Sequence, residues 1–405
     1  MSEVAVRSLA MIIGVLLCAG VGLDAFQTII LPRRPTGRLR ITRIFYRATW
    51  GPWSFFTRRL KDERTREQVY SIYGPLSLLL LLLLWAVLLI VGFGLVYFAL
   101  KTPFANQMTQ RAGMRFEIWT DLYVSGTTLF TLGLGDVVPK MAAARGVIIF
   151  ESGVGLGFVA LVVGYLPVLY GTFSRREVSV ALLDARAGSP PTAAELLARH
   201  GVDGGQEALI ELLAEWERWA AELLESHVSY PLLCYYRSQH DNQSWLSALV
   251  AILDTCAMLI ASVQGIPARQ AQLTFAIARH ALVDLGHIFK LDERVRQIRE
   301  SKMDRLPANE FRKLCSVLGN TNLQLCGDDN SIVRLGQLRE MYEPNALALA
   351  YHLGFSMPPW IAVPRENDQW RRVAALRSSP EGRAEAKQVI DQSIPALPHE
   401  DDDSH

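Results

Sequence analysis

Three long apolar runs, separated by charged stretches, dominate the N-terminal part of the chain. The run at residues 71–100 carries no charge, and the run at residues 146–173 is interrupted only by Glu151. The run at residues 9–31 contains one charge, Asp24. A helix needs roughly 20 apolar residues to cross a hydrocarbon core about 30 Å thick, so each run predicts a transmembrane helix. Because an isolated charge at this depth is expensive, Asp24 is expected to face protein, water or a headgroup, or to lie near the interface.

The charge between the first two runs predicts the orientation of these helices. Residues 32–67 hold eleven arginines and lysines against three acidic residues, a net charge of +8. Strongly basic loops stay in the cytoplasm. The N-terminus and residues 101–145 are therefore expected outside, and Arg175 and Arg176 mark the return of the chain to the cytoplasm. The predicted localisation is the cell membrane, multi-pass, with a cytoplasmic C-terminal domain.

Residues 32–70 form a basic cytoplasmic segment that has a helical pattern. Apolar side chains recur at helical spacing and arginines fall on another face: Ile41, Ile44, Phe45 and Ala48 against Arg40, Arg43 and Arg47. Four aromatic residues follow them: Trp50, Trp53, Phe55 and Phe56. The pattern predicts a helix on the inner leaflet, with arginines at anionic headgroups and aromatic rings at the boundary. The alternative is a topogenic charge cluster that binds no lipid.

A glycine-containing segment, residues 131–136, lies between the second and third runs. Residues 116–130 before it can form a short helix. Irregular backbone at membrane depth survives only where protein buries it or where it lines a water-filled path. Gly133 and Gly135 can take positive φ at little cost, and such alternation can turn successive carbonyls the same way. Several copies around an axis would stack rings of oxygen that replace the hydration shell of a monovalent cation, and Thr131 would add a hydroxyl ring.

This segment, Thr131-Leu132-Gly133-Leu134-Gly135-Asp136, resembles the potassium-channel signature threonine-x-glycine-x-glycine-aspartate, set between an outer and an inner helix. The resemblance covers about residues 71–175. It implies a potassium selectivity filter at residues 131–135, with Asp136 at the filter mouth. There Asp136 would either attract cations or anchor the segment against its supporting helix. One chain supplies one filter strand, so the resemblance also implies a homotetramer, with K⁺ as the permeant ion and no cofactor.

The segment departs from the usual family pattern at three positions. The family usually has threonine at the place of Phe130, valine at Leu132, and tyrosine or phenylalanine at Leu134. Leucine at position 134 is similar to the second pore segment of some two-pore potassium channels. It keeps the backbone carbonyl but loses the aromatic ring that supports the filter wall. We therefore expect cation conduction with potassium preferred, to a degree that the sequence leaves open.

The third apolar run carries two candidate gating residues. In related channels the inner helix lines the cavity and often bends at a glycine, and Gly155 matches this position best by its distance from the filter. The alternative role of Gly155 is close helix packing through a small residue. Pro167 either kinks the cytoplasmic end and shapes a gate, or marks where the helix begins to break.

The C-terminal half of the chain predicts a mainly α-helical cytosolic part. Residues 176–191, with the sequence Gly-Ser-Pro-Pro near their end, predict a linker, and residues 192–397 a helical domain. Residues 398–405 predict an acidic, disordered tail. Residues 247–263 are apolar enough to mimic a fourth crossing, but Asp254 interrupts them near the middle. A buried bundle helix is therefore the better interpretation.

Composition narrows the remaining function classes. The net charge is only +1, from 41 basic and 40 acidic residues, so the bulk basic character suited to nucleic acid is absent. Five cysteines without a CxxC spacing argue against a disulfide scaffold and a zinc site, and Cys315 and Cys326 are interpreted as structural thiols. His280 and His287, seven apart on one predicted helix, could seed a metal or proton sensor, although ordinary histidines are the commoner case. No motif supplies a reaction, so an enzyme is not expected.

Together these patterns predict an all-α membrane protein, a pore-loop ion channel with three transmembrane helices per chain and a cytosolic helical domain. Residues 1–31 hold the N-terminal helix, and residues 71–175 hold the outer helix, pore helix, filter and inner helix. The predicted function is passive, potassium-selective or potassium-preferring conduction through a tetrameric pore, with the cytosolic domain acting in assembly or gating. The expected partners are the lipid bilayer, anionic lipids at the basic segment and further copies of the chain, without nucleic acid. The alternative is a non-conducting, membrane-anchored sensory or interaction protein with a channel-like membrane region.

Overall fold

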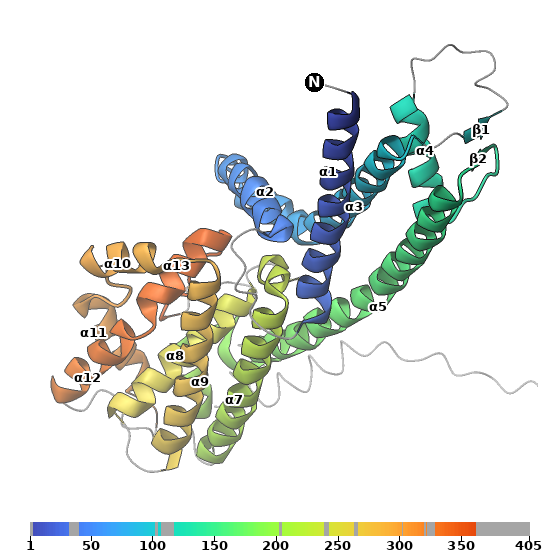
Figure 1. Ribbon diagram of the computed structural model, residues 1–405. Coiled ribbons are helices and arrows are strands. Elements are labelled where there is room, and N and C mark those ends of the chain that lie inside the picture. Colours follow the sequence, from blue (N-terminus) through green and yellow to red (C-terminus); the bar gives the residue numbers. More distant parts are fainter. Residues whose placement is uncertain are drawn as a thin grey trace, which may run out of the picture.

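The computed structural model describes residues 3–31, 40–101, 104–106, 117–201, 205–238, 243–262, 266–301, 303–319, 321 and 329–361. Figure 1 shows an extended bundle of long helices joined to a compact helical domain. The extended bundle contains α1 (Glu3–Ala25), the π-helix η1 (Phe26–Ile30), α3 (Glu63–Ala99), α4 (Glu117–Leu129) and α5 (Ala142–Ala187). Two short strands, β1 (Phe104–Asn106) and β2 (Val137–Pro139), pair antiparallel at its outer end.

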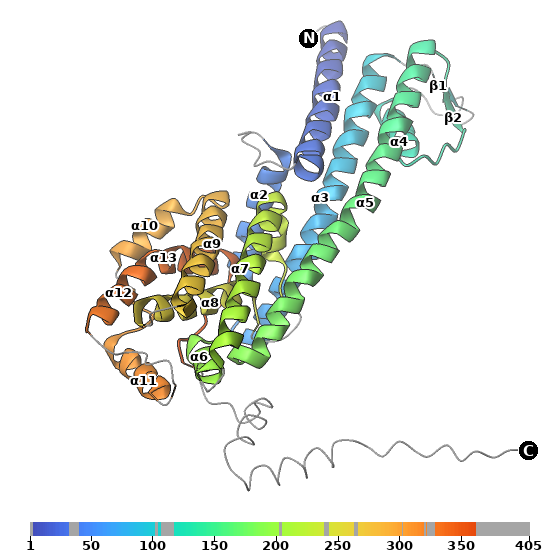
Figure 2. The ribbon, with the colours of Figure 1, turned by 90° about the horizontal axis from the view of Figure 1, so that it is seen from below.

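The compact domain is built from shorter helices, and α2 (Ile41–Thr57) lies between it and the extended bundle. Its elements are α6 (Ala193–His200), α7 (Gly205–Ser229), the 3-10 helix η2 (Pro231–Tyr235), α8 (Trp245–Ser262), α9 (Ile266–Ile288), α10 (Asp292–Glu300), α11 (Ala308–Leu318), α12 (Asp329–Glu340) and α13 (Glu343–Leu353). Figure 2 shows α1, α3 and α5 running along the extended part, away from this domain.

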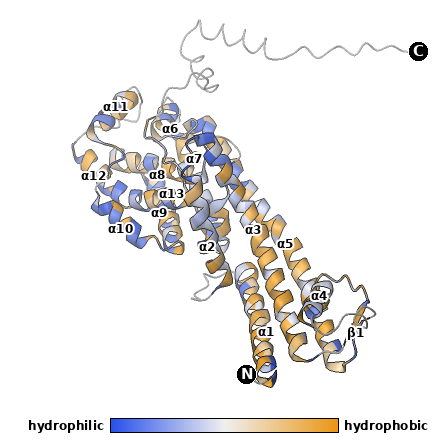
Figure 3. Cartoon of the chain, turned by 90° about the horizontal axis from the view of Figure 1, so that it is seen from above, coloured by the Kyte–Doolittle hydropathy of each residue, from blue (hydrophilic) through white to orange (hydrophobic). Residues whose placement is uncertain are grey.

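The three apolar runs form α1, α3 and α5, as the hydropathy pattern predicts, and Figure 3 shows hydrophobic residues along all three helices. α1 and α3 approach closely through small residues. A Cβ on Gly14 would lie 2.6 Å from the carbonyl oxygen of Gly92, and a Cβ on Gly92 would lie 2.6 Å from the Cys18 sulfur. Contact between backbones supplies the van der Waals packing that holds helices together in lipid.

Asp24 faces protein and joins three helices. Its carboxylate accepts hydrogen bonds from the backbone N–H of Thr42 at 3.0 Å, from the Thr42 hydroxyl at 2.5 Å and from the Trp85 indole at 3.0 Å. The Arg40 guanidinium lies 3.6 Å away. These partners offset the desolvation of a buried carboxylate and place it at the N-terminus of α2, where the helix dipole also favours negative charge.

α2 is a helix, but its aromatic side chains do not all lie at a lipid boundary. Trp50 is buried, and its indole N–H donates to the carbonyl of His352 in α13 at 3.1 Å. Its ring lies 4.7 Å from the rings of Tyr73 in α3 and Tyr235 in η2. Phe56, in contrast, is 65% exposed. α2 therefore docks one face on the helical domain and leaves another face free to meet a membrane.

α5 extends beyond the predicted inner helix. It passes through Pro167 and Arg176 without ending and stops at Gly188, which has a φ of +83°. Most of the predicted linker, residues 176–187, is therefore helical, and only residues 188–191 form an irregular turn. Arg176, one of the two arginines at the predicted return to the cytoplasm, is buried against the protein.

Four helices of the described chain are long and apolar enough to cross a membrane, and the fourth is α8. The apolar window of α8 is 89% buried, whereas that of α5 is 11% buried. Asp254 in α8 pairs with Arg305 at 2.9 Å. Burial within the domain and an internal cation for its carboxylate identify α8 as a core helix, in agreement with the bundle-helix interpretation.

Cys315 is the residue at which the structure differs from the sequence interpretation of the cysteines and histidines. Cys18, Cys234 and Cys256 are free, but Cys315 is disulfide-bonded, so its interpretation as a thiol is wrong. His280 and His287 each face a different carboxylate, and no cluster of three or more potential metal ligands occurs among the residues that the structure describes. Cys326 and the predicted tail at residues 398–405 lie outside those residues.

Candidate ion pathway

The candidate pathway begins where α4 ends. After Leu129 the chain folds back on the last turn of the helix, and the amides of Thr131 and Leu132 donate to the carbonyls of Thr128 and Thr127 at 2.9 and 2.8 Å. These bonds satisfy carbonyls that the end of a helix leaves without intrahelical partners. They also fix the direction in which residues 131–136 leave the helix.

Positive φ angles alternate along this segment. Thr131 has a φ of +56°, Gly133 of +54° and Gly135 of +73°, and the residues between them lie in the common regions. The predicted alternation at the two glycines is thus present, and it begins at Thr131, two residues before the first glycine. A β-branched residue with positive φ is an outlier, and such strained backbone is held mainly at functional sites.

Residues 131–136 are exposed in the single chain. Leu132 and Leu134 leave 63% and 62% of their surfaces uncovered. Large uncovered apolar side chains at a structured segment are typical of a surface that meets another molecule. In one copy of the chain, therefore, no other part of the described protein covers this segment.

The outer end of the segment is anchored on both sides. The Tyr123 hydroxyl of α4 donates to the Asp136 carboxylate at 2.9 Å. β2 follows directly and pairs with β1, which comes shortly after α3. Of the two roles considered for Asp136, anchoring to the supporting helix is the one for which the structure provides a contact.

Glu151 ties α4 to the two long helices around it, α3 and α5. It is fully buried in α5 and accepts hydrogen bonds from the Tyr97 hydroxyl of α3 and the Ser125 hydroxyl of α4, both at 2.5 Å. The sequence marks Glu151 only as an interruption of an apolar run. Carboxylates within such runs usually face the protein interior and have a function, and that is the signal from which this role could be inferred.

Gly155 lies where α5 crosses the end of α4. A Cβ built on it would lie 1.9 Å from the carbonyl oxygen of Leu129, the last residue of α4. Close packing is therefore the role for which this glycine has a contact, while hinge bending at Gly155 stays a prediction. Pro167 is exposed on α5, and the helix continues to Ala187, so Pro167 does not mark a helix break.

Part of the chain matches a known protein family. Residues 84–169, which run from α3 through α4 and the 131–136 segment into α5, match the family described as "Ion channel". This segment is an ion channel domain. The predicted resemblance and the all-α, multi-pass membrane architecture are thereby confirmed, and the family points to a non-enzymatic protein.

One curated relative supports the membrane assignment. The chain is 31% identical over 189 residues to the "Uncharacterized membrane protein YdjJ" of Bacillus subtilis (strain 168). The match covers 46% of this chain and 53% of the relative, so the chain spans about half the length of the curated relative that it matches. No solved structure matches the chain.

Proposed function

We propose that four copies of this chain form a potassium channel, in which dehydrated K⁺ passes between the backbone carbonyls of residues 131–135. The observation that carries the proposal is the alternation of positive φ at Thr131, Gly133 and Gly135, inside an ion channel domain. Alternating backbone handedness lets successive carbonyls turn toward one side. Rings of such oxygens replace the water around the cation.

The uncovered surfaces of the extended bundle support assembly of several copies. Residues 131–136 are exposed in one chain, and the apolar window of α5 is 11% buried, compared with 44% for that of α3. A closed ring formed by one repeated surface is the usual symmetry of such assemblies. Four copies bring four segments to one axis, where the carbonyls of Leu132 and Leu134 and the hydroxyl of Thr131 contribute successive rings.

The proposed orientation places the N-terminus and the β1–β2 pair outside and the helical domain in the cytoplasm. The arginines and lysines of residues 40–66 favour the cytoplasmic side by the positive-inside rule. On that side the exposed face of α2 meets anionic headgroups. Phe55 and Phe56, both more than half exposed, supply apolar anchors on this helix.

The helical domain acts on the inner helix through Arg176. Its guanidinium donates to the carbonyls of Leu233 and Tyr236, both at 2.9 Å, and contacts the His227 imidazole at 3.0 Å. Burial, together with the adjacent Arg176, lowers the pKa of His227 well below its ordinary value. A neutral imidazole can accept from the guanidinium, so displacement of α7 or η2 is passed directly to α5.

Flux measurements on purified protein in liposomes test this function. Potassium-loaded vesicles should release K⁺, and Gly133→Ala should abolish the release because alanine resists positive φ. Gly171→Ala is the matched control, since a Cβ on Gly171 meets nothing within 4 Å. Absence of flux from the wild type across voltage, pH and calcium conditions would favour the non-conducting sensory protein. Equal permeation of Na⁺ and K⁺ would leave a cation channel but refute the potassium preference.

A further inference from the structure

A cavity of about 520 Å³ lies between α2 and the N-terminal half of α3. α2 lines it with one helical face, from Phe45 to Thr57, and α3 with one face from Val69 to Leu80. The turn that joins the two helices closes one end through Leu60. The volume falls within the range of roughly 300–1,000 Å³ typical of cavities that bind small molecules.

The hydroxyl groups of the cavity wall already have partners within the protein, whereas the buried indole nitrogen of Trp53 has none among the described residues. The hydroxyls of Thr49, Thr57 and Ser77 donate to backbone carbonyls of their own helices at 2.9, 2.7 and 2.9 Å. The wall therefore presents hydrocarbon and aromatic carbon to an occupant. A polar molecule would lose its hydration here and gain at most the one hydrogen bond that the Trp53 indole can donate, whereas an alkyl chain would gain contact area along the whole wall.

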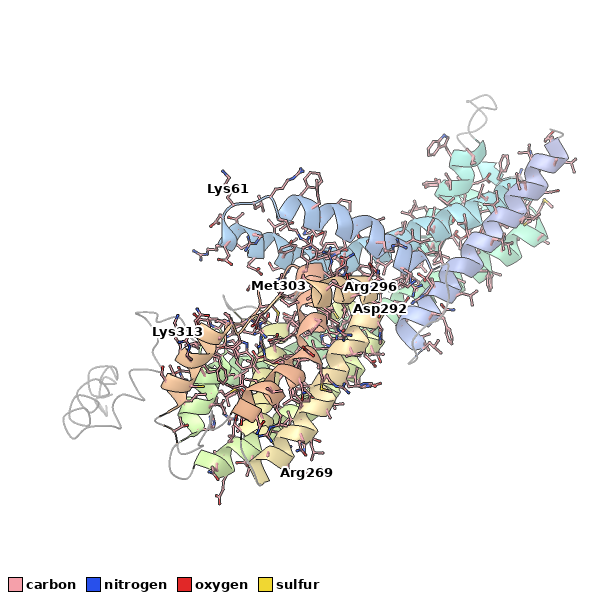
Figure 4. All side chains as sticks on the ribbon, turned by 90° about the vertical axis from the view of Figure 1, so that its left-hand side faces the viewer. Lys61, Arg269, Asp292, Arg296, Met303 and Lys313 are labelled. Atoms are coloured by element: carbon pink, nitrogen blue, oxygen red, sulfur yellow. The ribbon has the colours of Figure 1, made fainter. Side chains whose placement is uncertain are left out.

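The cavity has a charged end and a membrane end. Exposed Arg59 and Lys61 lie next to Leu60 in the turn, and Lys61 extends away from the ribbon there (Figure 4). At the other end the wall reaches Leu80, which belongs to the apolar run of α3 and is 41% exposed. An anionic phospholipid matches this arrangement, because its charged headgroup can lie at the cations and its acyl chain can lie along the apolar wall.

The wall of the cavity also contacts the helical domain. The Tyr73 hydroxyl forms a hydrogen bond with Thr49 at 3.0 Å, and the Tyr73 ring lies 5.3 Å from the ring of Tyr235 in η2. Tyr235 comes shortly after Leu233, whose carbonyl holds Arg176 of the inner helix. An occupant of the cavity therefore touches side chains that connect α2 and α3 to the contact between domain and pore.

We propose that this cavity binds one acyl chain of an anionic phospholipid, with the headgroup at Arg59 and Lys61. The inference rests on the proposed orientation, which places the α2–α3 turn at the cytoplasmic leaflet, and does not depend on ion conduction. In this proposal the lipid chain binds at a defined site between α2 and α3, in addition to the general contact of α2 with the leaflet surface.

Quenching of tryptophan fluorescence tests the acyl-chain site, because Trp53 lines the cavity. Full-length protein in detergent is titrated with phosphatidylglycerol that carries brominated chains. Saturable quenching is expected, and it should fall in Trp53→Phe and in Ala48→Phe, which fills the cavity from an exposed position. Ile44→Phe is the matched control, since Ile44 is exposed on the same helix but does not line the cavity. Equal quenching in the wild type and in both cavity variants would overturn the proposal.

The headgroup assignment is tested with the same titration. Brominated phosphatidylcholine should bind more weakly than phosphatidylglycerol, and Arg59→Gln with Lys61→Gln should weaken phosphatidylglycerol by about thirtyfold, or about fivefold per cation. Lys290→Gln with Arg296→Gln, two exposed cations of the helical domain, should leave binding unchanged. If the two lipids bound equally, or if the double substitution of Arg59 and Lys61 had no effect, the proposal that the bound lipid is anionic would be overturned. The lipid titration does not measure ion flux, so its result is independent of the flux assay. If the protein bound lipid in this way but conducted no ions, the proposed channel would be refuted and the lipid site would stand.

Discussion

Substitution of Gly155 by alanine should disturb the filter without touching it. The added Cβ would lie 1.9 Å from the Leu129 carbonyl oxygen, and real Cβ contacts essentially never fall below 3.0 Å. The end of α4 and α5 must therefore separate by at least 1.1 Å, the difference between these two distances. Leu129 is buried and is followed by one residue before Thr131, so the shift is passed to the first carbonyls of the segment. Overpacking of this kind costs about 1–3 kcal/mol.

Two assays measure the effect. We expect Gly155→Ala to lower the melting temperature of the detergent-solubilised protein by several degrees and to abolish K⁺ release from liposomes. Gly157→Ala, on the same helix, is the control, because a Cβ there meets nothing within 4 Å and alanine favours a helix over glycine by about 1 kcal/mol. If Gly155→Ala retained wild-type melting and flux, close packing between α4 and α5 would not control the filter.

Three further perturbations test other parts of the structure. Burial, with Arg58 nearby, lowers the pKa of His352 to about 4. The unfolded state therefore takes up the proton first, and stability should fall by up to about 3 kcal/mol as the pH drops from 6.5 to 4, less so in His352→Gln. Arg305→Met should cost about 3–5 kcal/mol in thermal scans because it leaves Asp254 buried without its cation, and adding Asp254→Leu should recover part of the loss. Tyr123→Phe should lower K⁺ flux several-fold, because Asp136 loses the hydrogen bond that anchors it to α4, and unchanged flux would show that the anchor is dispensable.

The sequence predicts the membrane helices and the alternating backbone at Gly133 and Gly135 because both depend on local chemistry. An uninterrupted apolar run leaves a helix as the favourable state in lipid. Glycines at alternate positions permit a backbone that other residues resist, so Gly133 and Gly135 identify the segment by themselves. Thr131 gives no such signal, because its positive φ is imposed by the turn that follows α4.

Contacts between distant elements could not be predicted in the same way. The roles of Glu151 and Asp136 depend on hydroxyl groups of other helices, and a single sequence does not state which helices meet. The amphipathic pattern of α2 is the same whether its apolar face meets lipid or protein, so the pattern does not predict the hydrogen bond between Trp50 and α13. A hydrophobic face identifies what a helix buries, but not its partner.

The length of α5 shows a different limit of hydropathy. The apolar run ends at residue 173, and the helix continues to Ala187 through alanine, leucine, arginine and glutamate, which favour helices in water as well. Hydropathy marks the end of the membrane core rather than the end of the helix. The helix ends where Gly188 adopts a positive φ.

A structure of the assembled protein with thallium, an electron-dense substitute for K⁺, tests the central proposal most directly. The account predicts a column of thallium density on a fourfold axis, at the level of the carbonyls of residues 131–135 from four copies. Density for the ion should be lost in Gly133→Ala. If the four segments lay far from a shared axis, with their carbonyls turned into their own subunits, the proposed conduction pathway would be contradicted.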